Sequence, residues 1–198
     1  MNDTLKTIAA RYSCRAFTDR DVSDADLRTV ADAGTKAPSG MNRQNWHIII
    51  VKNKSLLSEM ETEGMRVLSG FYDKTMYDRI MGRGGKLFYN APCMVFIAVK
   101  EAVPKGAELI DLGIAAQNIS LAATSLGIDN CHCGLVAFCF AGGKADEFKR
   151  KLKFPDGYEV GLGILLGYGG AQGTPHTPDK SKITFINRSE ETNNGITF

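Results

Sequence analysis

Hydrophobic positions along this chain follow two patterns, and each predicts a different kind of element. Apolar residues three and four positions apart predict amphipathic helices. These helices are expected over residues 3–12, 23–34, 55–65, 108–126 and 144–152. Short, nearly continuous apolar runs predict strands at 46–51, 94–99 and 160–168, and the first is continuous enough to be buried on both faces. Together these elements predict an α+β domain spanning residues 1–198.

The end of the chain does not continue these patterns. After Gly170 the sequence becomes polar and extended, with Pro175 and Pro178, and only residues 183–186 resemble a further strand. A segment of this kind cannot bury itself against its own chain. We therefore expect residues 174–198 to form a tail that docks on a partner subunit.

Composition narrows the class of protein. The chain has 198 residues, of which 43% are hydrophobic and 23% charged, and its formal net charge is +2. These values are typical of globular proteins and give no reason to expect nucleic acid or membrane as a partner. The polar first residues do not resemble a signal peptide, and no apolar run is long enough to cross a membrane. Five cysteines, an odd number, are expected to be reduced thiols in the cytoplasm.

The first candidate site contains Arg11, Ser13 and Arg15. If the first helix continues, the two arginines lie four residues apart on one face, with the hydroxyl between them. Two guanidinium groups and a hydroxyl near a helix end make a plausible phosphate clamp. The alternative is two solvated arginines on a surface helix.

The second candidate site is the turn that follows the second helix. Pro38 ends that helix, and Ser39, Gly40 and Asn42 are turn formers that leave backbone N–H groups available. Gly40 lets the backbone approach a flat ligand closely. The alternative is an ordinary polar loop between a helix and a strand.

The third candidate site is the run Cys131-His132-Cys133-Gly134. A metal site is disfavoured because no second cluster at ligand spacing exists in the sequence. A nucleophilic cysteine is also weakly supported, since adjacency in sequence is not the spatial pairing that catalysis needs. The other interpretations are buried thiols, or a loop that directs backbone N–H groups at a ligand.

Residues 71–77 are less informative. Phe71, Tyr72, Met76 and Tyr77 form a stripe at helical spacing that usually belongs to a core, although methionine-rich surfaces also line permissive pockets. A glycine-rich loop with several basic residues follows.

Five motifs, in this order, resemble the FMN-dependent nitroreductase family. They are Arg11-x-Ser13-x-Arg15-x-Phe17, Ala37-Pro38-Ser39-x-x-Asn42-x-Gln44-x-Trp46, Ala91-Pro92, the helix from Asp111 to Gly127, and Leu166-Gly167-Tyr168. The resemblance covers nearly the whole chain. It implies an α+β fold with a central antiparallel-rich sheet flanked by helices, and an intertwined homodimer with two FMN molecules in the interface.

The resemblance also implies roles for the candidate residues. Arg11 and Ser13 would meet the FMN phosphate, and Arg15 would reach the ribityl chain or the pyrimidine edge. The following residues would complete the site: Pro38, Ser39 and Asn42 from the other subunit, Cys133 and Gly134 with a backbone N–H against flavin N5, and Lys180 and Lys182 on the phosphate. The family's contact to the pyrimidine edge from the middle helices has no clear match, and Arg79, Arg83 and Lys86 are unresolved candidates.

The implied reaction is a two-step exchange in which NADH or NADPH reduces FMN and an electron-poor acceptor, such as a nitroaromatic or a quinone, then takes the electrons. No catalytic side chain and no metal are required. Two alternatives stay open: a flavin-dependent dehalogenase-type reductase, and a flavin-binding or redox-sensing protein with little turnover in which Cys131 and Cys133 act as the sensor.

Overall fold

The structure of this chain is a computed structural model that describes residues 1–101, 105–170 and 173–186. Its centre is a sheet in the order β1-β2-β4-β3, in which every neighbouring pair is antiparallel. The strands are β1 (Trp46–Val51), β2 (Cys93–Lys100), β3 (Asp129–Cys133) and β4 (Tyr158–Gly167). The predicted α+β class with an antiparallel-rich sheet is confirmed.

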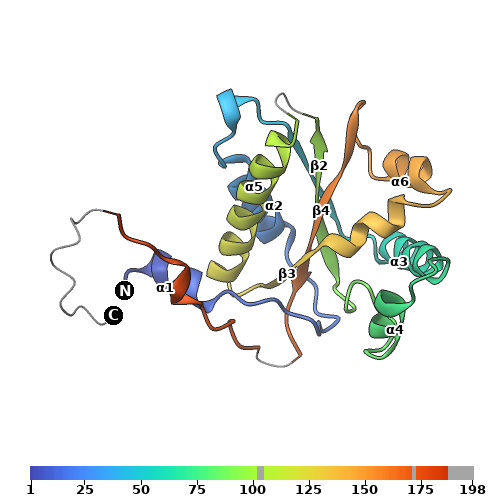
Figure 1. The fold of residues 1–198 in the computed structure, drawn as a ribbon, viewed down its shortest axis with the longest axis horizontal. Helices are drawn as coiled ribbons and strands as arrows, with labels where there is room; N and C mark the ends of the chain where they lie inside the picture. Colours follow the sequence, from blue (N-terminus) through green and yellow to red (C-terminus); the bar gives the residue numbers. More distant parts are fainter. Residues whose placement is uncertain (102–104, 171–172, 187–198) are drawn as a thin grey trace.

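Helices cover both faces of the sheet (Figure 1). One face carries α2 (Asp24–Thr35) and α5 (Ala107–Ser125), which pack against each other. The opposite face carries α3 (Lys54–Ser69), α4 (Thr75–Met81), the 3-10 segment η2 (Gly134–Phe140) and α6 (Ala145–Lys151). The N-terminal helix α1 (Asp3–Ala10) contacts α5.

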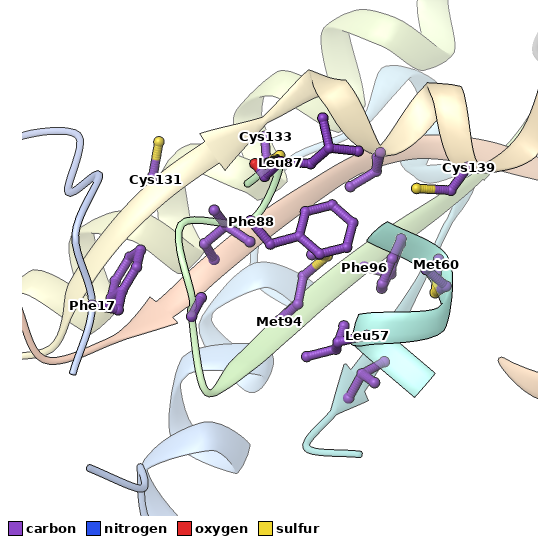
Figure 2. Packing of buried hydrophobic residues seen from close by; sticks show 14 of the residues in the cluster. Phe17, Leu57, Met60, Leu87, Phe88, Met94, Phe96, Cys131, Cys133 and Cys139 are labelled. Carbon is purple, nitrogen blue, oxygen red and sulfur yellow. Dashed lines mark hydrogen bonds between the residues drawn. The ribbon is translucent and has the colours of Figure 1, made fainter. Parts of the chain in front are cut away.

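Strand β2 divides the core into two clusters because its side chains alternate between the faces of the sheet. Met94 and Phe96 point toward α3, where they meet Met60 (Figure 2). Val95 and Ile97 point the other way, toward Ile119 of α5. All of these side chains are fully buried, so β2 is buried on both faces.

The prediction that residues 46–51 are buried on both faces is wrong. In β1 only Trp46 and Val51 are buried, and Ile50 is exposed. The reason is position: β1 lies at the edge of the sheet, where a hydrophobic run is only half covered by the helices.

Helix ends agree with the sequence at some positions and differ at others. Ser23 caps α2, since its Oγ accepts a hydrogen bond of 3.0 Å from the backbone of Asp26. Gly127 follows α5 with a φ of +72°, as a terminating glycine should. The cap of α3, however, is Asn53 and not Ser55, because the Asn53 side chain accepts from the Leu56 backbone N–H at 3.0 Å.

Two apolar stretches are more exposed than expected. Phe71, Tyr72 and Met76 are exposed, so the predicted core stripe is wrong for most of its members. Residues 183–186 pair with no strand in the described part of the chain, and Ile183, Phe185 and Ile186 are exposed. The rest of the predicted tail, 187–198, lies outside the described residues. Within the described ranges, no helix combines the length and the apolar character needed to cross a lipid bilayer.

The two candidate caps of α3 can be compared directly. Replacing Asn53 by Ala should lower the free energy of unfolding by about 1 kcal/mol, because the Leu56 N–H loses its partner. Replacing Ser55 by Ala should change it by less than about 0.5 kcal/mol. Urea denaturation of both variants at one protein concentration measures the difference, and a larger loss at Ser55 would show that the cap is misassigned.

Candidate functional site

The segment after α1 carries Arg11, Ser13 and Arg15 in an extended conformation, not in the predicted helix. The helix ends at Ala10, and Arg11 is already extended, with φ −62° and ψ 128°. The expected helical face shared by Arg11 and Arg15 is therefore wrong. In extended chain, alternate side chains share a side. Arg11, Ser13 and Arg15 can still act together, while Cys14 between them is buried.

This extended segment is attached to the sheet. Ser13 forms a parallel bridge with Asn130 of β3, and the Cys14 N–H donates to the Asn130 carbonyl at 2.9 Å. Further along, Phe17 bridges Gly169, just beyond β4. These pairings hold the arginine segment against the strand that carries the Cys131-His132-Cys133 run.

Side chains of that run alternate across β3. Cys131 and Cys133 are buried in the core cluster on the α3 side. His132 points to the other face, where its Nε2 lies 2.7 Å from Ser120 Oγ on α5. The three side chains therefore do not converge. In the described ranges, no group of three or more His, Cys, Asp or Glu side chains could hold a metal ion.

The thiols are poor candidates for redox or nucleophilic chemistry. Burial raises the pKa of Cys131, an effect that the charge of Arg15 and a hydrogen bond from Ser13 only partly oppose. Burial raises the pKa of Cys133 to about 12, and its Sγ donates to the Leu87 carbonyl at 3.7 Å. Since the thiolate is the reactive form, both groups are packed, protonated side chains at neutral pH.

Gly134 presents accessible backbone at the end of β3. It is exposed, and no atom lies within 4 Å of the position that a Cβ would occupy. A flat ligand can therefore approach the backbone here, beside the arginine segment. This geometry agrees with the interpretation of the run as a loop that offers backbone groups to a ligand.

Arg79, Arg83 and Lys86 are the unresolved basic candidates of the sequence. The structure gives Lys86 and Arg83 different partners. Lys86 forms an ion pair with Glu61 at 3.3 Å. Arg83 lies over the ring of Tyr89, with its guanidinium carbon 4.8 Å from the ring centroid. The carbonyl of Tyr89 accepts from the Phe17 N–H at 3.3 Å, so Arg83 belongs to the neighbourhood of Arg15. No sequence motif pointed to this position; the contact depends on tertiary packing.

The charges of this neighbourhood are not balanced within the chain. Among the described residues, no carboxylate forms an ion pair with Arg11, Arg15 or Arg83. Guanidinium groups are well suited to phosphate because they donate two parallel hydrogen bonds. The donor set next to Gly134 therefore fits a cofactor that has a phosphate group and a flat ring, as FMN has.

The Pro38 turn lies far from the arginine segment within one chain. The Gly40 N–H donates to Asp111 Oδ1 near the start of α5, at 3.1 Å. Ser13, by contrast, pairs with Asn130, whose Nδ2 donates to Thr124 Oγ1 in the last turns of α5. Thirteen residues of helix separate these anchor points by about 20 Å. Figure 1 shows the two segments at opposite ends of α5.

The backbone conformation and exposure of the turn residues nevertheless suit contact with another molecule. Met41, Asn42 and Gln44 all have positive φ, an unusual conformation for residues with side chains. Ser39 Oγ accepts from the Gln44 N–H at 2.9 Å, and Asn42 Oδ1 accepts from the Gln44 side chain at the same distance. Pro38, Met41 and Asn42 are exposed, and Ser39 is half-buried.

Lys180 and Lys182 lie in the short 3-10 segment η3 (Lys180–Lys182), which is exposed. The chain leading to them passes Tyr12: a Cβ on Gly173 would lie 2.1 Å from the Tyr12 ring. Within the described residues, no hydrogen bond or ion pair connects either lysine to Arg11, Ser13 or Arg15.

Comparisons with known proteins identify the family of this chain. The model of the Nitroreductase family matches residues 8–168. A nitroreductase of Desulfitobacterium hafniense, solved with bound FMN, is 51% identical and superposes with a TM-score of 0.91 over 94% of this chain and 99% of that one. A Bacteroides fragilis nitroreductase, also with bound FMN, is 29% identical, with a TM-score of 0.85 over 94% and 100% of the two chains.

A Bacillus subtilis protein named FMN reductase (NADPH) is 25% identical over 85% of this chain and 66% of its own length. The matched region includes the arginine segment, the Pro38 turn and all four strands of the sheet. The chain belongs to the nitroreductase family.

Proposed function

We propose that this protein is an NAD(P)H-dependent FMN oxidoreductase that reduces nitroaromatics, quinones or similar electron-poor acceptors. The observation that supports this most strongly is the row of Arg11, Ser13 and Arg15 held against β3, beside the open backbone of Gly134. Family membership and the similarity to nitroreductases solved with bound FMN support the same activity.

When bound, FMN supplies the two-electron chemistry, accepting a hydride at N5 and passing reducing equivalents to the acceptor. The protein's own groups bind and orient. Arg11 and Ser13 hold the phosphate, and Arg15 supplies positive charge toward the ribityl chain or pyrimidine edge. The backbone of Cys133 and Gly134 would lie along the ring, so the buried thiols would take no part in the chemistry.

The active protein is a homodimer whose site is built from both chains. The Pro38 turn and the arginine segment lie at opposite ends of α5 in one chain, and a second copy would bring Pro38, Ser39 and Asn42 to the partner's flavin. A suitable interface exists on α5 and α1, where Leu109, Ile110, Leu5 and Ile8 are exposed. An apolar surface of this kind is expected to be buried in an assembly.

The tail is assigned to the same interface. Residues 174–198 would embrace the partner, and Lys180 and Lys182 would add charge at the phosphate. The exposed Ile183, Phe185 and Ile186 provide apolar contacts for such docking. Five free, buried cysteines favour a reducing compartment, and we assign the protein to the cytoplasm.

The arginine segment can be tested by cofactor binding. Replacing Arg11 and Arg15 together by Ala should raise the Kd for FMN at least tenfold, since each charged phosphate contact contributes about 1.5–3 kcal/mol. Fluorescence titration of the apoprotein with FMN measures this change. Arg150→Ala, an exposed arginine on α6, is the matched control and should leave the Kd unchanged. A loss below about threefold in the double variant would refute the clamp.

The shared site can be tested by subunit mixing. A chain with Asn42→Ala is co-expressed with a chain carrying Arg11→Ala and Arg15→Ala, with a different affinity tag on each. If each site is built from both chains, one FMN site of the mixed dimer contains only wild-type residues, and the other contains all of the substitutions. NADH-dependent reduction of a nitroaromatic should therefore exceed that of either mutant homodimer.

If Asn42 serves its own chain, each position keeps one lesion and the activity equals the mean of the two homodimers. Light scattering on the wild-type protein provides the second readout. An active monomer that retains FMN would contradict the dimer assignment.

A further inference from the structure

We propose that Arg83 recognises the electron acceptor, and that the protein prefers acceptors whose aromatic ring carries a carboxylate over neutral acceptors of the same size. The inference rests on the proposed function, because it concerns the acceptor bound at the same site. It adds a specificity-determining residue that no motif of the chain assigns.

Two successive contacts connect Arg83 to the arginine segment, and the first of them is with Tyr89. Its guanidinium lies over the ring of Tyr89, and the Tyr89 carbonyl is bonded to the Phe17 N–H, two residues from Arg15. Leu87, two residues before Tyr89, accepts the hydrogen bond from Cys133 Sγ. Figure 2 shows Leu87 beside Cys133, with Phe88 next to them. The chain between Arg83 and Tyr89 therefore borders the end of β3.

The charge of Arg83 is available to a ligand. In the described part of the chain it has no carboxylate partner, whereas nearby Lys86 is paired with Glu61. At an exposed site, an aromatic face attracts a guanidinium only weakly and does not neutralise its charge. Stacking on the ring also leaves the edge of the guanidinium free, which is the edge that binds a carboxylate through two hydrogen bonds.

The location of Arg83 on a loop favours a ligand that enters and leaves over a resident cofactor. Arg11 and Arg15 belong to a segment hydrogen-bonded to β3 and the end of β4. Arg83 lies between Gly82 and two further glycines with positive φ, +95° at Gly84 and +68° at Gly85, and the backbone of this loop is hydrogen-bonded only to the end of α4, not to the sheet. Such a loop can adjust when an acceptor replaces the nicotinamide.

The same loop offers an apolar neighbour for the ring of an acceptor. Met81 is exposed, and its Sδ would lie 3.3 Å from a Cβ on Gly85. Thioether sulfur packs favourably against aromatic rings. Met81, the last residue of α4, and the guanidinium of Arg83 on the loop that follows match a small molecule with an apolar ring and one negative group.

Equilibrium binding tests the proposal without turnover. Benzoate and benzamide, which have nearly the same shape, are titrated into the FMN-loaded protein by calorimetry. Wild type should bind benzoate more tightly than benzamide. Arg83→Gln should weaken benzoate binding about tenfold and leave benzamide within twofold, whereas Arg150→Gln, at an exposed position of α6, should change neither.

Kinetics give the second readout. The ratio of kcat/KM for 4-nitrobenzoate to that for 4-nitrobenzamide should fall about tenfold in Arg83→Gln, while the Kd for FMN and the rate of flavin reduction by NADH stay unchanged. Equal binding of benzoate and benzamide by the wild type would overturn the inference and leave the proposed function intact.

Two other outcomes also overturn it. A Kd for FMN that rises as much as the Kd for benzoate would make Arg83 a cofactor contact. Slower reduction by NADPH but not by NADH would assign Arg83 to the extra phosphate of the donor. Failure of both nicotinamides to reduce the flavin would instead refute the proposed function itself.

Discussion

The site depends on one backbone interaction, the pairing of residues 13–18 with the edge of the sheet. The bridges of Ser13 to Asn130 and of Phe17 to Gly169 fix an otherwise irregular segment along β3 and β4. Thr18 extends this attachment, since its N–H donates to the Tyr168 carbonyl at 2.9 Å. Without this pairing, the arginines would be mobile surface side chains, and ordering them on a ligand would cost conformational entropy.

The pairing also explains why the charges at the site are tolerated. Arg15 is exposed and Arg11 is partly exposed, so water solvates both before a ligand arrives, while Cys14 between them fills the core. The thiols of Cys131 and Cys133 are similarly directed inward by the alternation of β3. The two-residue alternation of extended backbone thus places the apolar side chains, which stabilise the fold, on one side and the arginines, which can bind an anion, on the other.

Much of the fold could be predicted from the sequence, because its elements have strong periodic patterns. The helix beginning at Ser23 and the one ended by Gly127 agree closely with their caps. The failures have physical causes. The sequence could not show that β1 is an edge strand, because sheet order depends on pairings between distant residues. The exposure of Phe71 and Tyr72 likewise depends on what surrounds α4, which helical periodicity does not reveal.

The sequence predicts a shared face for Arg11 and Arg15 through a helix, whereas the structure gives them a shared side through an extended segment. The side chains of Arg11, Ser13 and Arg15 share a side because the chain is extended there, not because it is helical. Residues four apart share a face in a helix as well, so both conformations group Arg11 with Arg15. Arg83 had no such signal, since its relation to Arg15 runs through Tyr89 and Phe17.

The proposed two-chain site agrees with the composition of α5. Helix α5 is apolar on nearly all sides: Ala115 and Ile119 are buried, while Leu109 and Ile110 face outward. A helix of this composition normally lies inside a protein. Its outer face runs between the Pro38 turn at one end and the arginine segment at the other. In the proposed dimer, a second copy packed on that face would cover the apolar surface and add the missing turn to the cofactor in one step, so assembly and cofactor binding would be thermodynamically linked.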